Sequence, residues 1–584
     1  MAGQSRKWMV VAAAVWIQAF TGTNFDFSAY SSELKAAMRI SQVQLNYLAT
    51  ASDLGKALGW SSGLALLYLP LPVVLLLAAA IGLAAYGAQW LLITGRISLS
   101  YFPVFLLCLL AGCSICWFNT VCFVLCIRNF SLDRSLALGL TISFNGLSAS
   151  LYALAVNAVS SSSSSAYLLL NAALPLLAST AALLPILRRP SAALLLDSPS
   201  HDSHIFVLLH ILAFFTGLYL LFLNSLSSSS LTNARILLAG AVILLILPVC
   251  VPGLICSRDW SRRNIYSSSL FGFFGGAVDD FELQKQLVGS DEEESTGSNV
   301  IMNDNDWDGG DDADAGQHYC SCRGLMKGKL AAIGEEHSVA RLVRRIDFWL
   351  YYVAYFCGAT VGLVYSNNLG QIAQSLEKDS QTTTLITVYS SCSFFGRLLS
   401  SAPDFLRQKI HFPRTGWLAV AVVPLPVAFF LLAESGDMDA LLAGTALIGL
   451  SSGFIFSAAV SVTSELFGPN GLGVNHNILI TNIPLGSLLY GLLAALIYDA
   501  NGKTMAPVVV LRDGMVVCMG RKCYAKTFLW WACISLVSLA SSLALYFRTK
   551  ALYRRAARPR PHPPPAGEQV VEPEPEPEPE PAAG

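Results

Sequence analysis

The feature that most constrains this chain is a series of about fourteen apolar segments, each close to the length that crosses a lipid bilayer. A helix rises ~1.5 Å per residue, so ~20 apolar residues cross a hydrocarbon core of ~30 Å. Hydrophobic residues make up 54% of the 584 residues and charged residues only 13%, whereas soluble domains carry about a quarter charged residues. The sequence therefore predicts an all-α polytopic membrane protein. The predicted spans are residues 8–30, 44–69, 71–92, 101–125, 135–159, 166–187, 204–223, 234–251, 348–370, 382–399, 417–432, 440–464, 474–498 and 528–546.

One long acidic insertion divides these segments into two groups. It carries Asp291 to Glu294 and six further aspartates, and such a composition cannot bury enough apolar surface to order itself. We predict an N-terminal six-helix bundle at 1–190, two extra transmembrane helices at 191–256, an acidic disordered cytosolic loop at 257–345 and a C-terminal six-helix bundle at 346–547. The tail at 548–584 begins basic and ends in a Pro/Glu repeat, which is typical of an extended spacer.

The second helices of the two predicted bundles resemble each other. Ala51 to Leu58 reads ASDLGKAL and Cys392 to Leu399 reads CSFFGRLL, so both place Gly-[Lys/Arg]-x-Leu at the same point. Transporters built from repeated bundles retain this kind of internal similarity. The fold class that we predict is the two-bundle major facilitator type with about two additional helices.

Lysine and arginine indicate the orientation, because basic residues near span ends are retained on the cytosolic side. An N terminus inside places Arg6, Lys7, Arg128 and Arg414 on that side, and an even number of spans then places both termini in the cytosol. The N terminus is too poor in basic and serine residues for a transit peptide. We expect a multi-pass protein of the plasma membrane or an endomembrane.

Ionisable residues inside a span are costly, at ~2.5 to 3.5 kcal/mol on insertion scales, and are functional candidates by default. Asp53 and Lys56 lie deep in the second span on one helical face, since they are three residues apart. Asp53 either titrates during transport, which would couple transport to protons, or forms a static ion pair or gate with Lys56. Asp26 lies in the outer part of the first span.

Uncharged polar residues gather in the first and fifth helices of each predicted bundle, which line the central cavity of two-bundle transporters. They suit a small polar or anionic solute, although hydrogen bonding between helices is the other interpretation. With Asp26, the predicted cavity residues are Asn24, Asn145, Tyr365, Asn367, Asn368 and Asn482. The segment Asn482 to Gly486 contains a proline and predicts either a helix break beside the cavity or an ordinary proline kink.

The sequence contains no Walker, zinc-hydrolase, nucleophile-elbow or dinucleotide motif. We therefore expect no enzyme activity, cofactor, catalytic metal or nucleic-acid partner. Cys518 and Cys523 lie in one predicted outer loop, where a disulfide is one interpretation and two free thiols the other.

Several blocks resemble the plant nodulin-like proteins of the major facilitator superfamily, also labelled nuclear-fusion-defective-like. The similar blocks are Trp16 to Ser32, Leu45 to Lys56, Ile127 to Phe130, Ser143 to Ala149, Gly396 to Ser400 and Ser464 to Gly468. The resemblance implies a secondary transporter, and it implies that Arg397 and Asp404 form the inner gate of the second bundle. The middle glycine of the gate motif is Ser400 here, and Gly63 stands where the first bundle would have the acid.

The function that we expect is secondary transport of a small polar or anionic solute by alternating access, with proton coupling as an option. Asp53, Lys56, Arg397 and Asp404 are the coupling or gate candidates. The expected partners are the solute, protons and the lipid bilayer, and a monomer suffices. The alternative is a membrane sensor or scaffold that no longer transports and acts through its cytosolic loop and tail.

Overall fold

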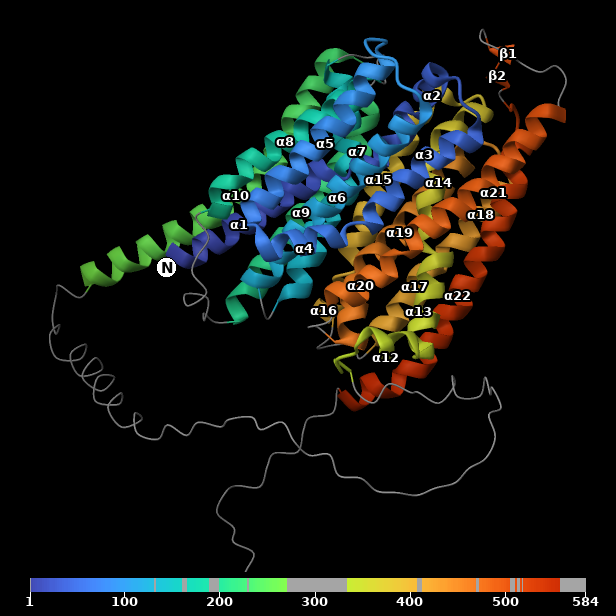
Figure 1. The fold of residues 1–584 in the computed structure, drawn as a ribbon. Helices are drawn as coiled ribbons and strands as arrows, with labels where there is room; N and C mark the ends of the chain where they lie inside the picture. The colour runs from blue at the N-terminus through green and yellow to red at the C-terminus, as the bar shows by residue number, and fades with distance from the viewer. Residues whose placement is uncertain are drawn as a thin grey trace, which may run out of the picture.

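The computed structural model describes residues 2–130, 133–159, 165–187, 199–227, 230–269, 333–406, 412–468, 472–504, 510–511, 515–516 and 518–556. Nearly all of these residues are helical, and the helices run roughly side by side along one long direction (Figure 1). The acidic cluster, Cys320, Cys322 and the Pro/Glu repeat lie outside the described residues.

The N-terminal half contains the helices of the first predicted bundle. They are α1 (Ala2–Thr21), η1 (Thr23–Asp26), α2 (Phe27–Met38), α3 (Gln42–Ala57), α4 (Trp60–Tyr68), α5 (Leu71–Ile93), α6 (Tyr101–Asn129), α7 (Arg134–Val159) and α8 (Ser165–Leu187). A capping box fixes the start of α3, because Ser41 Oγ accepts from the Gln44 amide and Gln44 Oε1 accepts from the Ser41 amide.

The C-terminal half follows two further helices, α9 (Pro199–Ser227) and α10 (Leu231–Ser269). Its elements are α12 (Val339–Val343), α13 (Ile346–Cys357), α14 (Ala359–Ser375), η4 (Asp379–Gln381), α15 (Thr382–Leu399), α16 (Ala402–Leu406), α17 (Arg414–Val422), α18 (Pro424–Glu434), α19 (Met438–Phe467), α20 (Leu472–Ile480), α21 (Asn482–Thr504), β1 (Val510–Leu511), β2 (Met515–Val516) and α22 (Lys522–Ala556). The strands pair antiparallel, with Val510 opposite Val516.

Eleven helices in the described part of the chain are long and apolar enough to cross a bilayer. The three other predicted spans, residues 8–30, 44–69 and 382–399, are also helical in the structure. All three spans hold functional candidates: Asp26 lies in η1 between α1 and α2, the Asp53–Lys56 pair lies on α3, and Arg397 lies on α15.

Five predicted spans are each built from two consecutive helices rather than one. The breaks lie at Gly22, Gly59, Gly358, Val423 and Thr481. The last break precedes Pro484, in the segment where the sequence predicts a break or a kink. At Val423 the cause is the following proline, which lacks an amide hydrogen and begins α18 at its first position.

The two halves repeat one packing arrangement in atomic detail. A Cβ atom added to Gly55 would lie 2.0 Å from the Leu109 carbonyl oxygen, and one added to Gly396 would lie 2.0 Å from that of Leu450. The reciprocal contacts are similarly close: a Cβ atom on Gly112 would lie 1.7 Å from the Ser52 carbonyl oxygen, and one on Gly453 would lie 2.2 Å from that of Ser393. Glycine is required where helix backbones approach so closely, so the sequence repeat reflects a structural repeat.

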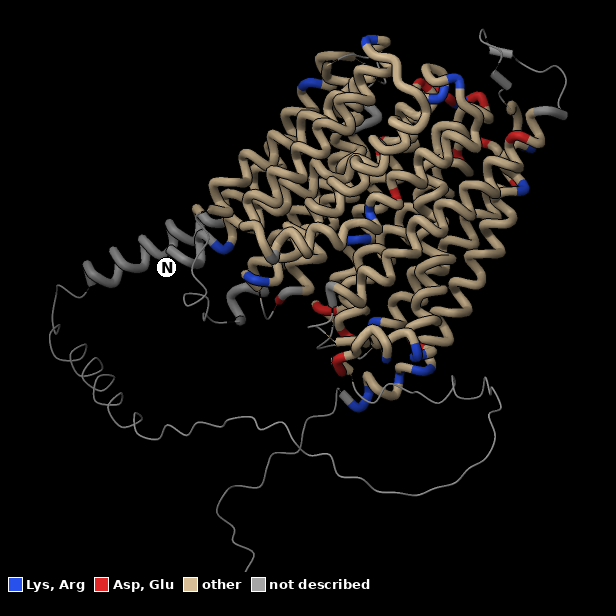
Figure 2. The backbone as a smooth tube through the Cα atoms, in the orientation of Figure 1, with Lys and Arg blue, Asp and Glu red and all other residues tan. Residues whose placement is uncertain are grey.

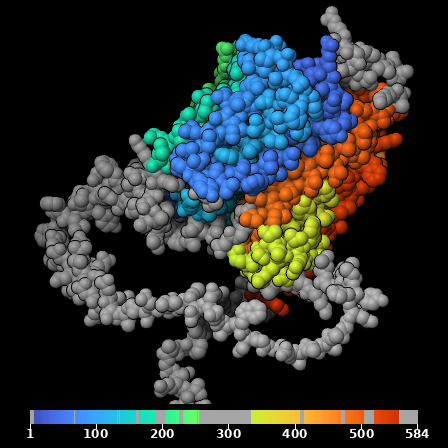
Figure 3. Space-filling view, in the orientation of Figure 1, coloured from blue at the N-terminus to red at the C-terminus, as the bar shows by residue number. Residues whose placement is uncertain are grey.

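The halves meet along three lines of contact: α7 packs against α15, α3 against α21, and α2 against α14. Helix α9 packs against both α7 and α15, so it bridges the halves on that side. Figure 3 shows the halves as adjoining blocks, blue to cyan and yellow to orange. We call the end with Arg128 and Arg414 the inner end and the end with Lys35 and Cys518 the outer end, following the predicted topology.

Charged residues gather at these two ends, and few lie in the middle of the helical body (Figure 2). Burial in an apolar body penalises charge, so each charge far from the ends needs a specific explanation. Asp26, Asp53, Lys56 and Arg397 are the four predicted candidates of this kind.

Candidate solute-binding cavity

A cavity of about 540 Å³ lies between the two halves. Residues from α3, α4, α6 and α7 form one wall, and residues from α13, α15, α19 and α20 form the other. The cavity extends from Asn24 and Phe25 in η1 to Leu66, Arg128 and His476 near the inner end. Lys56, Arg128 and Arg397 line it, but none of its lining residues is aspartate or glutamate. Its surroundings are therefore electropositive.

Arg397 is the buried cation of this cavity, with 6% of its surface exposed. Its NH1 group donates to the Ile142 carbonyl at 3.4 Å, and its guanidinium carbon lies 5.4 Å from the Phe25 ring centroid and 5.7 Å from that of Phe456. In the part of the chain that the structure describes, no carboxylate forms an ion pair with Arg397. The aromatic faces offset part of the cost of burying the charge, but its Nε atom has no hydrogen-bond partner.

Space for Arg397 comes from Gly146 on α7. A Cβ atom added there would lie 3.1 Å from Cδ of Arg397 and 3.0 Å from the Phe394 amide nitrogen. Glycine thus lets α7 and α15 approach each other while the arginine passes between them. The side chain contacts the N-terminal half although its helix belongs to the C-terminal half.

Lys56 occupies the equivalent position in the N-terminal half, but its charge is neutralised. Its Nζ lies 2.6 Å from Oδ1 of Asp53, one turn earlier on α3. Lys56 lines the large cavity, whereas Asp53 lines a separate small cavity of about 20 Å³ with Asn24, Tyr30 and Asn367. Oδ2 of Asp53 is buried without a hydrogen-bond partner. The pair separates the two cavities.

The predicted cavity residues fall into different environments. Asn24 and Asn145 line the large cavity, and Asn367 lines only the small one. Tyr365 and Asn482 do not line either cavity: the Tyr365 hydroxyl bonds to Thr445 within the C-terminal half, and the Asn482 amide donates to the Tyr352 carbonyl beside the helix break. In this structure both side chains are turned toward partners in the C-terminal half and not toward the large cavity.

Contacts between the halves close the outer end. The Asn368 side chain donates to Asn46 at 3.2 Å, so Asn368 belongs to this closure rather than to the cavity wall. The Gln371 amide donates to Ser31 at 2.9 Å. A Cβ atom added to Gly370 would lie 2.4 Å from the Ser28 carbonyl oxygen, so the backbones of α2 and α14 nearly touch. These hydrogen bonds join uncharged groups, and one charged contact lies beside them: Lys35 of α2 is 5.4 Å from the ring centroid of Tyr498 on α21.

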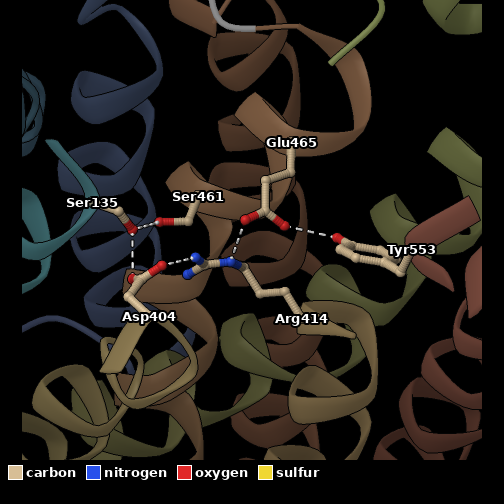
Figure 4. A network of polar contacts seen from close by, with 6 residues as sticks. All are labelled: Ser135, Asp404, Arg414, Ser461, Glu465 and Tyr553. Carbon is tan, nitrogen blue, oxygen red and sulfur yellow. Dashed lines mark hydrogen bonds and ion pairs between the residues drawn. The ribbon is translucent and has the colours of Figure 1, made fainter. Parts of the chain in front are cut away.

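Asp404 does not pair with Arg397, so the inner gate predicted from the family motif requires correction. Asp404 instead pairs with Arg414, which also bonds to Glu465 at 2.9 Å (Figure 4). The Ser135 hydroxyl from α7 donates to Asp404, and the Tyr553 hydroxyl donates to Glu465. Arg397 lies on α15 and faces the cavity, whereas Asp404 lies after the helix end, beside the first turn of α7, where a carboxylate is favoured. The network still joins both halves at the inner end.

Asp26 is completely buried, and it lines neither cavity. The structure therefore places its side chain outside the walls of these two cavities. Cys518 and Cys523, which were predicted as a possible pair, form a disulfide in the structure.

Several residues of the cavity wall were not predicted from the sequence. His476 from α20 lines the cavity, and its buried Nδ1 has no partner; a histidine inside a predicted span was a usable signal. Phe25 and Phe456 flank Arg397, but phenylalanine is so common in membrane helices that no sequence signal could have selected them.

Comparison with known proteins agrees with this architecture. The Nodulin-like family model matches residues 7–253, and the model described as NFD4, C-terminal domain, matches residues 331–555. The chain is 55% identical to the protein NUCLEAR FUSION DEFECTIVE 4 of Arabidopsis thaliana, covering 95% of this chain and 91% of that protein. It is 26% identical to the probable transporter mch1 of Emericella nidulans, over 32% of this chain and 36% of that protein.

Among solved structures, a member of the proton-dependent oligopeptide transporters superposes with a TM-score of 0.51 at 10% identity, covering 94% of this chain and 99% of that one. A bacterial homologue of the human drug peptide transporters gives a TM-score of 0.50 at 12% identity, over 94% and 100% of the two chains. At such identities the likeness shows the fold alone. The chain thus belongs to the nodulin-like family and is a multi-pass membrane protein with the fold of the major facilitator transporters.

Proposed function

We propose that this protein is a secondary transporter of a small organic anion, and that Arg397 binds the anionic group of the solute. The observation that carries the proposal is the unpaired, buried guanidinium of Arg397 in a cavity without any lining carboxylate. A buried charge that lacks a partner is costly. An anionic solute would supply that partner, and an arginine fork can bind a carboxylate or phosphate through two hydrogen bonds.

The remaining cavity wall suits an organic solute rather than an inorganic ion. Phe25, Phe456, Ile142, Ile480 and Ile483 provide apolar surface around Arg397. The amides of Asn24 and Asn145 add donors and acceptors, and the Asn145 Nδ2 has no partner of its own. A volume of about 540 Å³ falls within the range of ~300–1,000 Å³ that is usual for small-molecule sites.

The contacts between the halves support alternating access. The cavity extends to the inner end, while hydrogen bonds between uncharged residues close the outer end. Each such hydrogen bond is worth only about 0.6 kcal/mol on average in membrane proteins. Rocking of the two halves would break them at low cost and expose the same cavity to the outer side, with the inner end and both termini in the cytosol.

The test is a counterflow assay in proteoliposomes that contain the full chain. The panel should include monocarboxylates, dicarboxylates, organic phosphates, neutral amino acids and organic cations, and we expect exchange of anions only. Arg397→Lys keeps the charge but removes the planar fork, so it should lower transport efficiency at least about tenfold, consistent with the loss of ~1.4 kcal/mol or more. Arg235→Lys, outside the cavity, is the matched control and should transport as the wild type.

Exchange of only neutral or cationic solutes would overturn the proposal, as would full anion exchange in Arg397→Lys. If no solute in the panel exchanges although the protein is folded, the sensor or scaffold alternative is favoured. In that case deletion of the acidic loop should still produce a phenotype in cells.

A further inference from the structure

Asp26 is the buried acid that the proposed solute cavity leaves unexplained. It is the last residue of η1, and none of its surface is exposed. Neither carboxyl oxygen has a hydrogen-bond partner in the described part of the chain. It precedes α2, but its side chain makes no capping hydrogen bond to that helix. The carboxyl group of Asp26 therefore stabilises no other part of the fold through a hydrogen bond.

The described groups closest to Asp26 are neutral phenols and include no cation. The phenols of Tyr30, Tyr86, Tyr152 and Tyr167, from four different helices, lie within electrostatic range of its carboxyl group. The hydroxyl of Tyr152 donates to the Phe20 carbonyl, and that of Tyr86 bonds to Thr23. The Tyr167 hydroxyl is buried without a partner, and none of the four phenols forms a hydrogen bond with Asp26.

Helices α2, α7 and α15 pack against η1, and Tyr86 of α5 forms a hydrogen bond with Thr23 of the same turn. Beyond the tyrosines already named, the titratable groups of α15 near this turn are Tyr389, Cys392 and Arg397. Arg397 faces the other side of the turn, over the Phe25 ring. An ionised carboxylate buried without a cation or donor is so unfavourable that such groups take up a proton instead.

We propose that Asp26 binds and releases the proton that accompanies the transported anion. This inference rests on the proposed function. The proton passes from water to the carboxylate when the outer end is open, forming the neutral acid. In the buried position that the structure shows, Asp26 keeps this proton. It returns the proton to water at the inner end only when a shift of η1 during solute release exposes the carboxyl group. One proton and one monoanion then cross together, so the transport cycle moves no net charge.

Three consecutive residues of η1, Asn24 to Asp26, connect Asp26 to the solute site. Asn24 lines the large cavity, Phe25 lies against the Arg397 guanidinium, and Asp26 faces the tyrosines. Gly22 anchors this turn on α7, since a Cβ atom there would lie 2.3 Å from the Asn145 carbonyl oxygen. Binding of an anion to Arg397 shifts Phe25, and the same rigid turn shifts Asp26.

A route for the proton lies next to the turn. The small cavity of about 20 Å³ is lined by Asn24, Tyr30 and Tyr86, two of which lie around Asp26. This volume admits about one water molecule. Asp53 lines the same cavity but is paired with Lys56, so Asp26 rather than Asp53 is the acid without a countercharge.

The first test does not require a known solute. Infrared spectra of the purified full-length protein at neutral pH should show the carbonyl absorption of a protonated carboxylic acid. That band should disappear in Asp26→Asn and remain in Asp53→Asn, the matched control. Asp26→Ser is a second neutral variant if Asp26→Asn does not fold. A wild type without the band, or a band lost only in Asp53→Asn, would overturn the inference.

The second test uses proteoliposomes and an anion that the wild type exchanges. In Asp26→Asn an inward proton gradient should no longer drive accumulation, while counterflow persists, because exchange needs no proton release. Accumulation that survives in Asp26→Asn, or that follows a sodium gradient instead, would contradict the inference. Absence of anion counterflow in the wild type would refute the proposed function, whereas the infrared result would still report on Asp26.

Discussion

The second helices of the two halves, α3 and α15, place a basic residue at the same point of the same packing motif. Gly55 and Gly396 are in contact with equivalent backbone oxygens, and Lys56 and Arg397 follow them. The residue one turn earlier differs: Asp53 pairs with Lys56, whereas Phe394 stands at the equivalent position before Arg397. The repeat thus preserves the backbone packing and changes the charge, which leaves one cation compensated and the other unpaired.

This asymmetry gives the two halves different roles. The N-terminal half supplies the neutralised pair and the turn that holds Asp26, while the C-terminal half supplies the unpaired cation. A symmetric cavity with two unpaired cations would carry a greater cost of burial. We expect the loss of the unpaired cation to affect transport, and the other changes to affect mainly stability.

The largest effect on transport is expected from removing the unpaired cation. Arg397→Gln should lower anion transport efficiency by more than about 30-fold, since truncating one partner of a buried charge pair costs ~2 kcal/mol or more. The double variant Asp53→Asn, Lys56→Gln should lose no more than about threefold, because the pair is already neutral. Initial uptake rates over a range of solute concentrations measure both. Equal losses would remove the functional distinction between the two helices.

The inner network should affect stability rather than solute binding. Arg414→Gln leaves both Asp404 and Glu465 without their cation, and we expect a loss of about 3–5 kcal/mol of unfolding free energy. Denaturant unfolding in detergent measures this loss. The affinity for the anion should remain that of the wild type. A large fall in anion affinity would instead place this network in the solute site and join Asp404 functionally to Arg397.

Breaking the pair on α3 should destabilise the protein less than Arg414→Gln. Asp53→Asn leaves the Lys56 ammonium without a countercharge, and we expect a loss of about 1–3 kcal/mol, reduced from the fully buried value because Lys56 faces the cavity. The double variant Asp53→Asn, Lys56→Gln should recover most of this loss. Thermal and denaturant unfolding of the three proteins form the comparison. A double variant no more stable than the single one would show that the two residues are not coupled.

The smallest difference is expected between the equivalent glycines. Gly55→Ala and Gly396→Ala each place a methyl group against a backbone oxygen, and each should cost about 1–3 kcal/mol through overpacking. The two losses should agree within about 0.5 kcal/mol, which is the usual precision of additivity. Unfolding measurements on both variants test this expectation. Clearly unequal losses would mean that the two helix crossings are not structurally equivalent.

Much of the architecture could be predicted from the sequence. The fold class, the repeat of α3 in α15 and the region of the break before Pro484 follow from apolar length, glycine spacing and a missing amide hydrogen. The family resemblance was confirmed by the comparisons. The candidate residues of the cavity were predicted less well, because Asn24, Asn145, Lys56 and Arg397 line it, while Tyr365 and Asn482 point elsewhere.

The sequence by itself determined which segments are helical and cross a bilayer. The hydrocarbon core contains no water, so a segment that crosses it must form its own backbone hydrogen bonds and must be apolar over the full thickness. Both properties can be read along the sequence. Only the tertiary structure decided the partner of each polar group. Asp404 lies seven positions after Arg397 in the sequence, yet it bonds to Arg414 and to Ser135 from the other half. The rotation of each helix and the packing between the halves fix such partners, and neither is encoded in the spacing of residues along one helix.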